Sequence, residues 1–204
     1  MSQPSGRIVV LISGAGSNLI ALVDACKRGE VPGRITGVVA DRPCRGLEVA
    51  GACGLEANVV DFKSYASRQK WSEALRDQVA RFRPDLVVSA GFMRITSPVF
   101  VDAFAGRFVN LHPSLLPAFP GAHAVRDALD FGVMVTGSTV HFVDREVDHG
   151  PIIAQECVPV RPDDSVESLH ERIKRVEHRL LPAACRLVLE GRARLVGART
   201  VFEE

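Results

Sequence analysis

The sequence predicts an α/β fold: a three-layer, doubly wound structure around a mostly parallel, mixed sheet, with a Rossmann-like N-terminal half. Three observations support this prediction. Short runs rich in β-branched residues alternate with helical patterns over residues 7–91. These runs are almost continuously apolar, which is typical of strands that helices cover on both faces. Two later strand patterns are separated only by the short loop 144–150, so the two strands must be antiparallel.

The first half of the chain repeats the strand and helix rhythm of βαβ units. In such a sheet, functional groups are expected at the carboxyl ends of the strands. The patterns predict strands at 7–12, 35–40, 58–60 and 85–91, and helices at 17–28, 46–53 and 65–82.

The second half departs from this rhythm. An apolar run at 108–112 leads into a proline-rich loop, which is stiff and too short to separate domains. Asp164, with Glu167 three residues later, predicts the N-cap of a last helix, and Pro182 is expected to kink or restart that helix. Between them the patterns predict a helix at 122–131 and strands at 135–143 and 151–160.

Length and composition are those of an ordinary globular protein. The chain has 204 residues, 47% of them hydrophobic, and we expect a single domain, 1–204, with a Rossmann-like half (1–110) and a second half (111–204). Lys and Arg number 25 against 24 Asp and Glu. The net charge of +1 therefore offers no bulk field for a nucleic acid or an anionic membrane, and neither is an expected partner.

Several classes of protein are disfavoured by what the sequence lacks. No apolar stretch approaches the roughly 20 residues that cross a bilayer, and no signal-like segment follows the N-terminus, so we expect a cytoplasmic location. The five cysteines are odd in number and form no C-x-x-C pair. With no H-x-x-x-H or H-E-x-x-H pattern either, neither a disulfide framework nor a metal site is expected.

A glycine-rich loop, SGAGSN at 13–18, follows the first strand and opens the first helix. Its backbone N–H groups and the positive end of the helix dipole would face one point, which suits a phosphate. Alternatively, Gly14 and Gly16 only permit a tight turn, with Ser17 or Asn18 as the N-cap. Asp41 ends the second strand, where a ribose-binding acid would lie in a nicotinamide enzyme, so a dinucleotide interpretation stays open.

The strand at 108–112 ends in Asn110 and His112, which point to the same face because strand side chains alternate. An amide can stabilise an oxyanion and an imidazole can move a proton, so the pair suits addition to a carbonyl group. Asp148 in the tight loop is the candidate carboxylate that would raise the pKa of His112 and favour the imidazolium. Alternatively, His112 is bonded to a neighbouring carbonyl group and Asp148 is a turn residue. His141 either lines the cleft or is hydrogen-bonded in the core.

Four stretches, RIVVLISGAGSNL, DLVVSAGFMRI, FVNLHPSLLPAFPG and GSTVHFVDREVDHGPII, closely resemble the phosphoribosylglycinamide formyltransferases of the formyltransferase superfamily. The resemblance extends from residue 7 to about residue 190. It implies the formyltransferase fold, a first half that binds the phosphate of glycinamide ribonucleotide and a second half that binds 10-formyltetrahydrofolate. It implies no metal or nucleotide cofactor, and the chain is expected to act as a monomer or a homodimer.

The resemblance also implies roles for individual residues. At two positions this chain departs from the pattern of the family: relatives often have an apolar residue in place of Thr96 and a lysine in place of Ala118. The catalytic residues of the family match Asn110, His112 and Asp148. Its ribotide-binding positions match Gly16, Ser17, Asn18 and Glu177, with Lys174 nearby. Its folate-binding positions match Arg68, Met93, Arg94, Ile95 and Thr96, with Asn110.

These roles predict one mechanism and leave three alternatives. The ribotide amine would attack the formyl carbon, Asn110 and His112 would stabilise the oxyanion, and a proton relay through Asp148 would free the folate nitrogen. A sugar-amine formyltransferase would share the three residues. A nicotinamide oxidoreductase would use Gly14, Gly16 and Asp41. An inactive binding module would keep only the phosphate loop.

Overall fold

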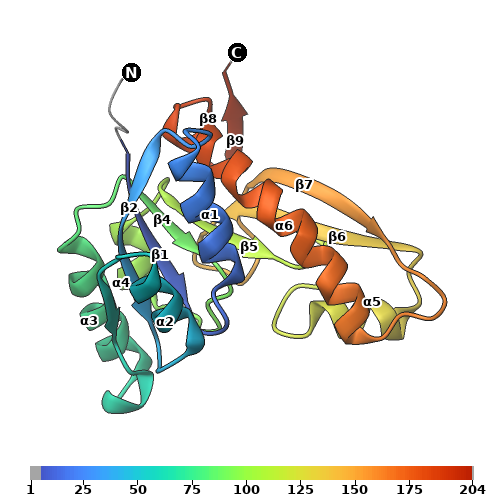
Figure 1. The fold of residues 1–204 in the computed structure, drawn as a ribbon, viewed down its shortest axis with the longest axis horizontal. Coiled ribbons are helices and arrows are strands. Elements are labelled where there is room, and N and C mark those ends of the chain that lie inside the picture. Colours follow the sequence, from blue (N-terminus) through green and yellow to red (C-terminus); the bar gives the residue numbers. More distant parts are fainter. Residues whose placement is uncertain (1–5, 204) are drawn as a thin grey trace.

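The computed structural model describes residues 6–203, and its main feature is a seven-stranded sheet between helices (Figure 1). The strands of this sheet are β1 (Gly6–Ile12), β2 (Gly33–Ala40), β3 (Ala57–Val59), β4 (Leu86–Ser89), β5 (Phe108–His112), β6 (Val135–Phe142) and β7 (Ile152–Pro159). Their order is β3-β2-β1-β4-β5-β6-β7. The first five pair in parallel, and β6 and β7 are antiparallel to their neighbours. The predicted mostly parallel, mixed sheet is confirmed.

Helices cover both faces of the sheet, because the strands are apolar on both sides. Ile8 and Val10 of β1 face one core with α1 and α6, and Val9 and Leu11 face another with α3 and α4; all four are fully buried. In Figure 1, α6 crosses the sheet in front of β6 and β7. The helices are α1 (Ser17–Lys27), α2 (Arg45–Ala52), α3 (Arg68–Ala80), α4 (Pro98–Ala103), α5 (Ala124–Phe131) and α6 (Val166–Leu189), with a 3-10 turn, η1 (Phe62–Ser64).

The last helix differs from its prediction at both marked positions. Its N-cap is Ser165, not Asp164: the Ser165 hydroxyl accepts from the Ser168 N–H at 3.2 Å, while the Asp164 carboxylate pairs with Arg172. The helix also continues through Pro182 instead of restarting there. Leu180 and Leu181 before the proline and Ala184 and Cys185 after it are buried, and this packing offsets the one backbone hydrogen bond that proline removes.

Four short elements were not predicted: η1, α4, β8 and β9. A short two-stranded sheet, β8 (Ala193–Val196) and β9 (Arg199–Phe202), follows α6, and α4 lies between β4 and β5. Each has six residues or fewer, too few for a hydrophobic period to be recognised in the sequence. Among the helices of residues 6–203, none combines the length and the hydrophobicity that a membrane span requires.

The direction in which successive strands are added to the sheet reverses between β1 and β4. From β1 it continues to β2 and β3 on one side, and from β4 it continues to β5 on the other. At such a switch point the loops after adjacent strands diverge and leave a crevice at their carboxyl ends, where ligands bind in open α/β sheets. The loops that follow β1 and β4, and the polar end of β5, all lie along this edge.

Candidate active site

Strand β5 ends in two polar side chains on one face. Leu111 packs in the core beneath α6, while Asn110 and His112 point to the opposite side. His112 is only 4% exposed and Asn110 is half-buried. Their partners come from the loops 113–121 and 143–151 and from the adjacent strand β6.

The imidazole of His112 lies between two acceptors. Its Nε2 is 2.8 Å from the carbonyl oxygen of Phe119, and its Nδ1 is 3.4 Å from Oδ2 of Asp148. A carbonyl oxygen only accepts hydrogen bonds, so Nε2 carries the hydrogen in the neutral ring. The lone pair of Nδ1 then faces the Asp148 carboxylate.

The pKa of His112 is lowered, contrary to the prediction from the sequence. Burial disfavours the charged ring and lowers the pKa, and this effect exceeds the raising effects of the Phe119 carbonyl and of Asp148; His141 lowers it further. The expected carboxylate is therefore present and acts in the expected direction, but it is outweighed. The imidazole is neutral at pH 7 in the protein without substrates.

The Asp148 carboxylate joins the two loops to β5. Its Oδ2 accepts the Gly121 N–H at 2.8 Å, and its Oδ1 accepts from Nδ2 of Asn110 at 3.3 Å. Burial alone would raise its pKa, but His141, the Gly121 N–H and His112 together leave the pKa lowered, so Asp148 is ionised. Asp148 has φ 52°, which aspartate tolerates in turns. A Cβ at Gly150 would overlap the Phe142 carbonyl, so the D-x-G spacing permits this tight loop.

His141 belongs to the same cluster, although the sequence left its role open. Its Nδ1 donates to the Phe142 carbonyl at 2.9 Å, so its Nε2 can accept from Nδ2 of Asn110 at 3.2 Å. The two hydrogens of the Asn110 amide thus face His141 and Asp148. His141 pairs with Asn110 across β5 and β6, and only this register, which the sequence does not reveal, assigns it to the site.

The glycine loop after β1 ends at an open helix N-terminus. Gly16, with φ 81°, is the N-cap of α1, so neither Ser17 nor Asn18 is the cap; both lie in the first turn. The first N–H groups of a helix have no partner within it, and here they face the crevice edge. Gly46 of α2 donates its N–H to the Gly14 carbonyl at 2.9 Å and packs against Gly16.

Two residues expected at the ribotide site are in contact. Nδ2 of Asn18 donates to Oε2 of Glu177 at 2.9 Å, joining α1 to α6. Glu177 is 4% exposed, and burial raises its pKa, while Asn18 and Lys174 act in the opposite direction. Oδ1 of Asn18 is buried without a hydrogen-bond partner among the described residues.

The loop after β4 carries the residues expected on the folate side. Met93 and Ile95 are 62% and 54% exposed, and Thr96 is half-buried. Arg68 is the first residue of α3 and lies on the same helix face as Ser72, whose hydroxyl accepts the N–H of Ser97 at 2.9 Å. The structure thus gathers the apolar side chains in the loop and leaves Arg68 at its border.

Asp41 is not available to a ribose. It is fully buried, and its Oδ2 accepts from Nε of Arg94 at 3.0 Å. A dinucleotide ribose would have to displace this ion pair from the interior. The acid on which the nicotinamide alternative depends is therefore already engaged by the protein.

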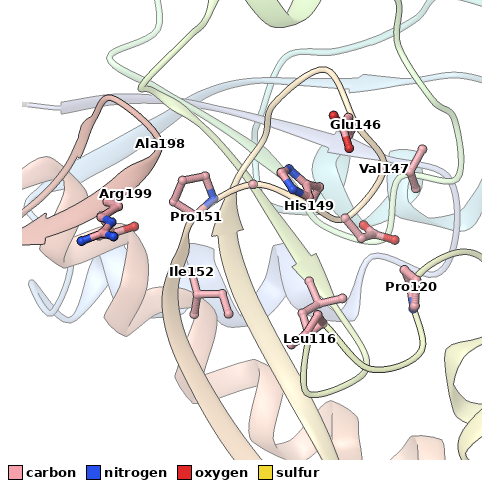
Figure 2. Close-up of a pocket in the computed structure, with 13 residues that line it drawn as sticks. Leu116, Pro120, Glu146, Val147, His149, Pro151, Ile152, Ala198 and Arg199 are labelled. Atoms are coloured by element: carbon pink, nitrogen blue, oxygen red, sulfur yellow. The ribbon is translucent and has the colours of Figure 1, made fainter.

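A hollow of about 570 Å³ lies beside the Asp148 loop. Figure 2 shows Glu146, Val147 and His149 on one side of it and Ala198 and Arg199 on the other. Asp148 borders the hollow, but neither Asn110, His112 nor residues 93–96 line it, so it is not the crevice at the switch point. Within residues 6–203, no cluster of three or more His, Cys, Asp or Glu side chains suits a metal ion.

Known proteins match the chain over most of its length. The family described as Formyl transferase matches residues 6–185. A phosphoribosylglycinamide formyltransferase of Mycobacterium tuberculosis is 52% identical over 178 residues, which are 87% of this chain and 82% of that protein. The trifunctional purine biosynthetic protein adenosine-3 of Bos taurus is 45% identical over 95% of this chain and 19% of that protein. The crystal structure of glycinamide ribonucleotide transformylase 1 from Symbiobacterium toebii has a TM-score of 0.96 and 46% identity, and covers 100% of this chain and 96% of that one.

Proposed function

This chain belongs to the formyl transferase family and transfers a formyl group to glycinamide ribonucleotide in purine biosynthesis, and from that premise we propose which residues carry the reaction. Asn110, His112 and Asp148 are the catalytic residues, and 10-formyltetrahydrofolate is the formyl donor. The observation that supports this assignment best is the cluster that the three side chains form at the carboxyl edge of β5: Asn110 donates to Asp148, and Nδ1 of His112 lies 3.4 Å from the same carboxylate.

The first step is attack of the neutral ribotide amine on the formyl carbon. A C–N bond forms, the formyl oxygen becomes an oxyanion, and the attacking nitrogen becomes positively charged. The Asn110 amide and the Nε2–H of His112 are the donors for the oxyanion. Without substrate the Phe119 carbonyl occupies that Nε2–H, and His141 and Asp148 occupy the Asn110 amide. The substrate oxygen therefore replaces one of these partners at each donor.

The second step moves one proton and breaks one bond. Asp148, ionised because its pKa is lowered, accepts the proton of the positively charged nitrogen and passes it through a water molecule to N10 of the folate, which regenerates the carboxylate. The C–N10 bond then breaks, and the oxyanion collapses to the new formamide. This mechanism keeps His112 neutral, in agreement with its lowered pKa, and replaces the imidazolium that the sequence suggested.

The substrate sites lie on either side of this cluster. Gly16, Ser17 and Asn18 receive the ribotide phosphate at the N-terminus of α1, and Glu177 holds the ribotide beside Asn18. The folate lies along Met93, Arg94, Ile95 and Thr96, bordered by Arg68 and Asn110. The exposed apolar side chains of Met93 and Ile95 fit the flat, mostly apolar ring system of such a ligand.

The remaining features follow from the same proposal. The chain acts as a single domain, 1–204, because one sheet spans the halves 1–110 and 111–204, and the ribotide site and the catalytic cluster both draw on the two halves. It works in the cytoplasm on small molecules, as a monomer or a homodimer. It needs neither a metal nor a partner nucleic acid or membrane.

Formyl transfer measured directly tests the proposal. The purified enzyme is given 10-formyltetrahydrofolate with glycinamide ribonucleotide, and parallel reactions contain amino sugars as acceptors or formate and ATP as donors. We expect turnover only with the first pair, and its loss in Asn110→Ala, His112→Ala and Asp148→Ala. Transfer to amino sugars alone would show that an amino sugar, not glycinamide ribonucleotide, is the acceptor. Near-normal turnover of all three variants would refute the proposed catalytic roles.

A further inference from the structure

We infer that Asp41 is a positioning residue for the folate: through Arg94 it holds the loop 91–96 in the shape that receives that ligand. The inference rests on the proposed function, because it takes this loop as part of the folate site. Asp41 does not touch the ligand itself. It acts from the end of β2, which β1 separates from β4 in the sheet.

Asp41 is a fully buried carboxylate, which proteins retain only where its charge is matched. Its Oδ2 accepts from Nε of Arg94 at 3.0 Å, and Nε of Arg42 lies 3.7 Å from its Oδ1. Oδ1 has no hydrogen-bond partner among the described residues. Arg94 therefore supplies the one direct hydrogen bond that its side chain accepts, across 53 positions of sequence.

Arg94 is held on a second side by an aromatic ring. Its guanidinium carbon is 4.4 Å from the ring centroid of Phe62, which follows β3. The side chain thus points back toward β2 and β3. Because it anchors there, its neighbours Met93 and Ile95 are directed outward, where they are largely exposed.

The start of the loop is fastened by the residue that follows β1. The N–H of Met93 donates to the hydroxyl of Ser13 at 2.8 Å, and the N–H of Ser13 donates to the Gly91 carbonyl at 3.2 Å. Ser13 and Asp41 hold the loop at two successive residues, Met93 and Arg94. A segment without helix or strand is thereby fixed before the ligand arrives, which lowers the ordering cost of binding.

This arrangement separates the folate from the other functions of the site. Asp41 contacts neither the catalytic cluster on β5 nor the first turn of α1 in the described hydrogen bonds. Loss of its charge should therefore weaken folate binding and leave the chemical step and the ribotide site nearly unchanged. A merely structural role would affect all three together.

The test is Asp41→Asn in the full chain, with steady-state kinetics in which each substrate is varied in turn. The substitution keeps the size and removes the charge. We expect the KM for 10-formyltetrahydrofolate to rise on the order of tenfold, as for one lost charge-assisted hydrogen bond, with kcat and the ribotide KM within about twofold of wild type. The matched control is Asp85→Asn, which removes the carboxylate partner of Arg7 (3.2 Å) at the amino end of β4 and should change neither KM.

Arg94→Gln removes the same ion pair by changing its other partner. The Arg94 side chain is 31% exposed, so this variant remains informative if Asp41→Asn folds poorly. It should raise the folate KM similarly, and the double variant should be no worse than the more affected single variant. An unchanged folate KM in both, or equal effects on both substrates, would overturn the inference. Absence of formyl transfer in the wild-type enzyme would instead refute the proposed function.

Discussion

Replacement of Asp148 by Asn separates the proposed chemistry from the structure of the loop. The carboxylate accepts two hydrogen bonds, from the Gly121 N–H at 2.8 Å and from the Asn110 amide at 3.3 Å. An asparagine has one acceptor oxygen, so its own NH2 group must face one of these donors. The variant therefore loses one hydrogen bond to a charged group and the proton-accepting carboxylate together.

The two losses differ in size. One hydrogen bond to a charged group contributes about 1–3 kcal/mol to the free energy of unfolding. In a protein of this length that corresponds to a decrease in Tm of roughly 2–12 °C. Loss of a positioned proton acceptor lowers kcat by about 10²–10⁴-fold, or roughly 3–5 kcal/mol of barrier. A folded variant with a small change in Tm should therefore be almost inactive.

The assay combines kcat, the dissociation constant of the ribotide and thermal unfolding for the same preparation. Ribotide affinity should change by less than about threefold, because Asp148 lies outside the phosphate loop. Asp144→Asn is the matched control in the same loop: its carboxylate accepts the Glu146 N–H at 2.9 Å and contacts none of the catalytic cluster. A kcat of Asp148→Asn within tenfold of wild type would refute the role of Asp148.

Three further predictions concern pH and the phosphate loop. Because the pKa of His112 is lowered from 6.5, kcat/KM should fall as the pH decreases to that lowered value, below 6.5: a proton on Nδ1 would bind the Asp148 carboxylate and occupy the relay. Between pH 6.5 and the lowered pKa of His112 the unfolded state binds more protons, so the free energy of unfolding should fall in that interval, before kcat/KM reaches its decline, as chemical denaturation at several pH values can show. Ser17→Glu should raise the ribotide KM by tenfold or more through repulsion of the phosphate, with little change in the folate KM. Gly46→Ala should lower the free energy of unfolding by about 1–3 kcal/mol and raise the ribotide KM, because a Cβ would lie 2.6 Å from Ile12 Cδ1 beneath the phosphate loop.

Each of these predictions has a matched control and a contrary result. His149→Asn removes the neighbouring exposed histidine and should leave the acid side of the profile in place. Ser17→Gln adds nearly the same bulk without charge, so an equal rise in KM for both variants would mean that size, not charge, matters. Gly51→Ala lies in the same helix with open space around it; if it destabilises the protein as much as Gly46→Ala, close packing at Gly46 is not the cause.

The hydrophobic pattern predicted most of the fold because it is local. Buried strands read as apolar runs, and alternation placed Asn110 and His112 on one face of β5 without any tertiary information. Where local signals were ambiguous or short, the prediction failed. The prediction placed the N-cap at Asp164, but the Asp164 carboxylate pairs with Arg172, and Ser165 caps the helix instead.

The sequence by itself determined the sheet, the loops at its carboxyl edge and the types of chemical group that those loops carry, because the spacing of apolar runs and the glycines and prolines between them encode these features. Only the tertiary structure decided which groups meet and in what state. The contact of Asn110 with Asp148 spans 38 positions and depends on how two loops fold back, and His141 joins them through strand register. The direction of the His112 pKa is a balance between burial and a nearby charge. Both are properties of three-dimensional surroundings, which no single segment specifies.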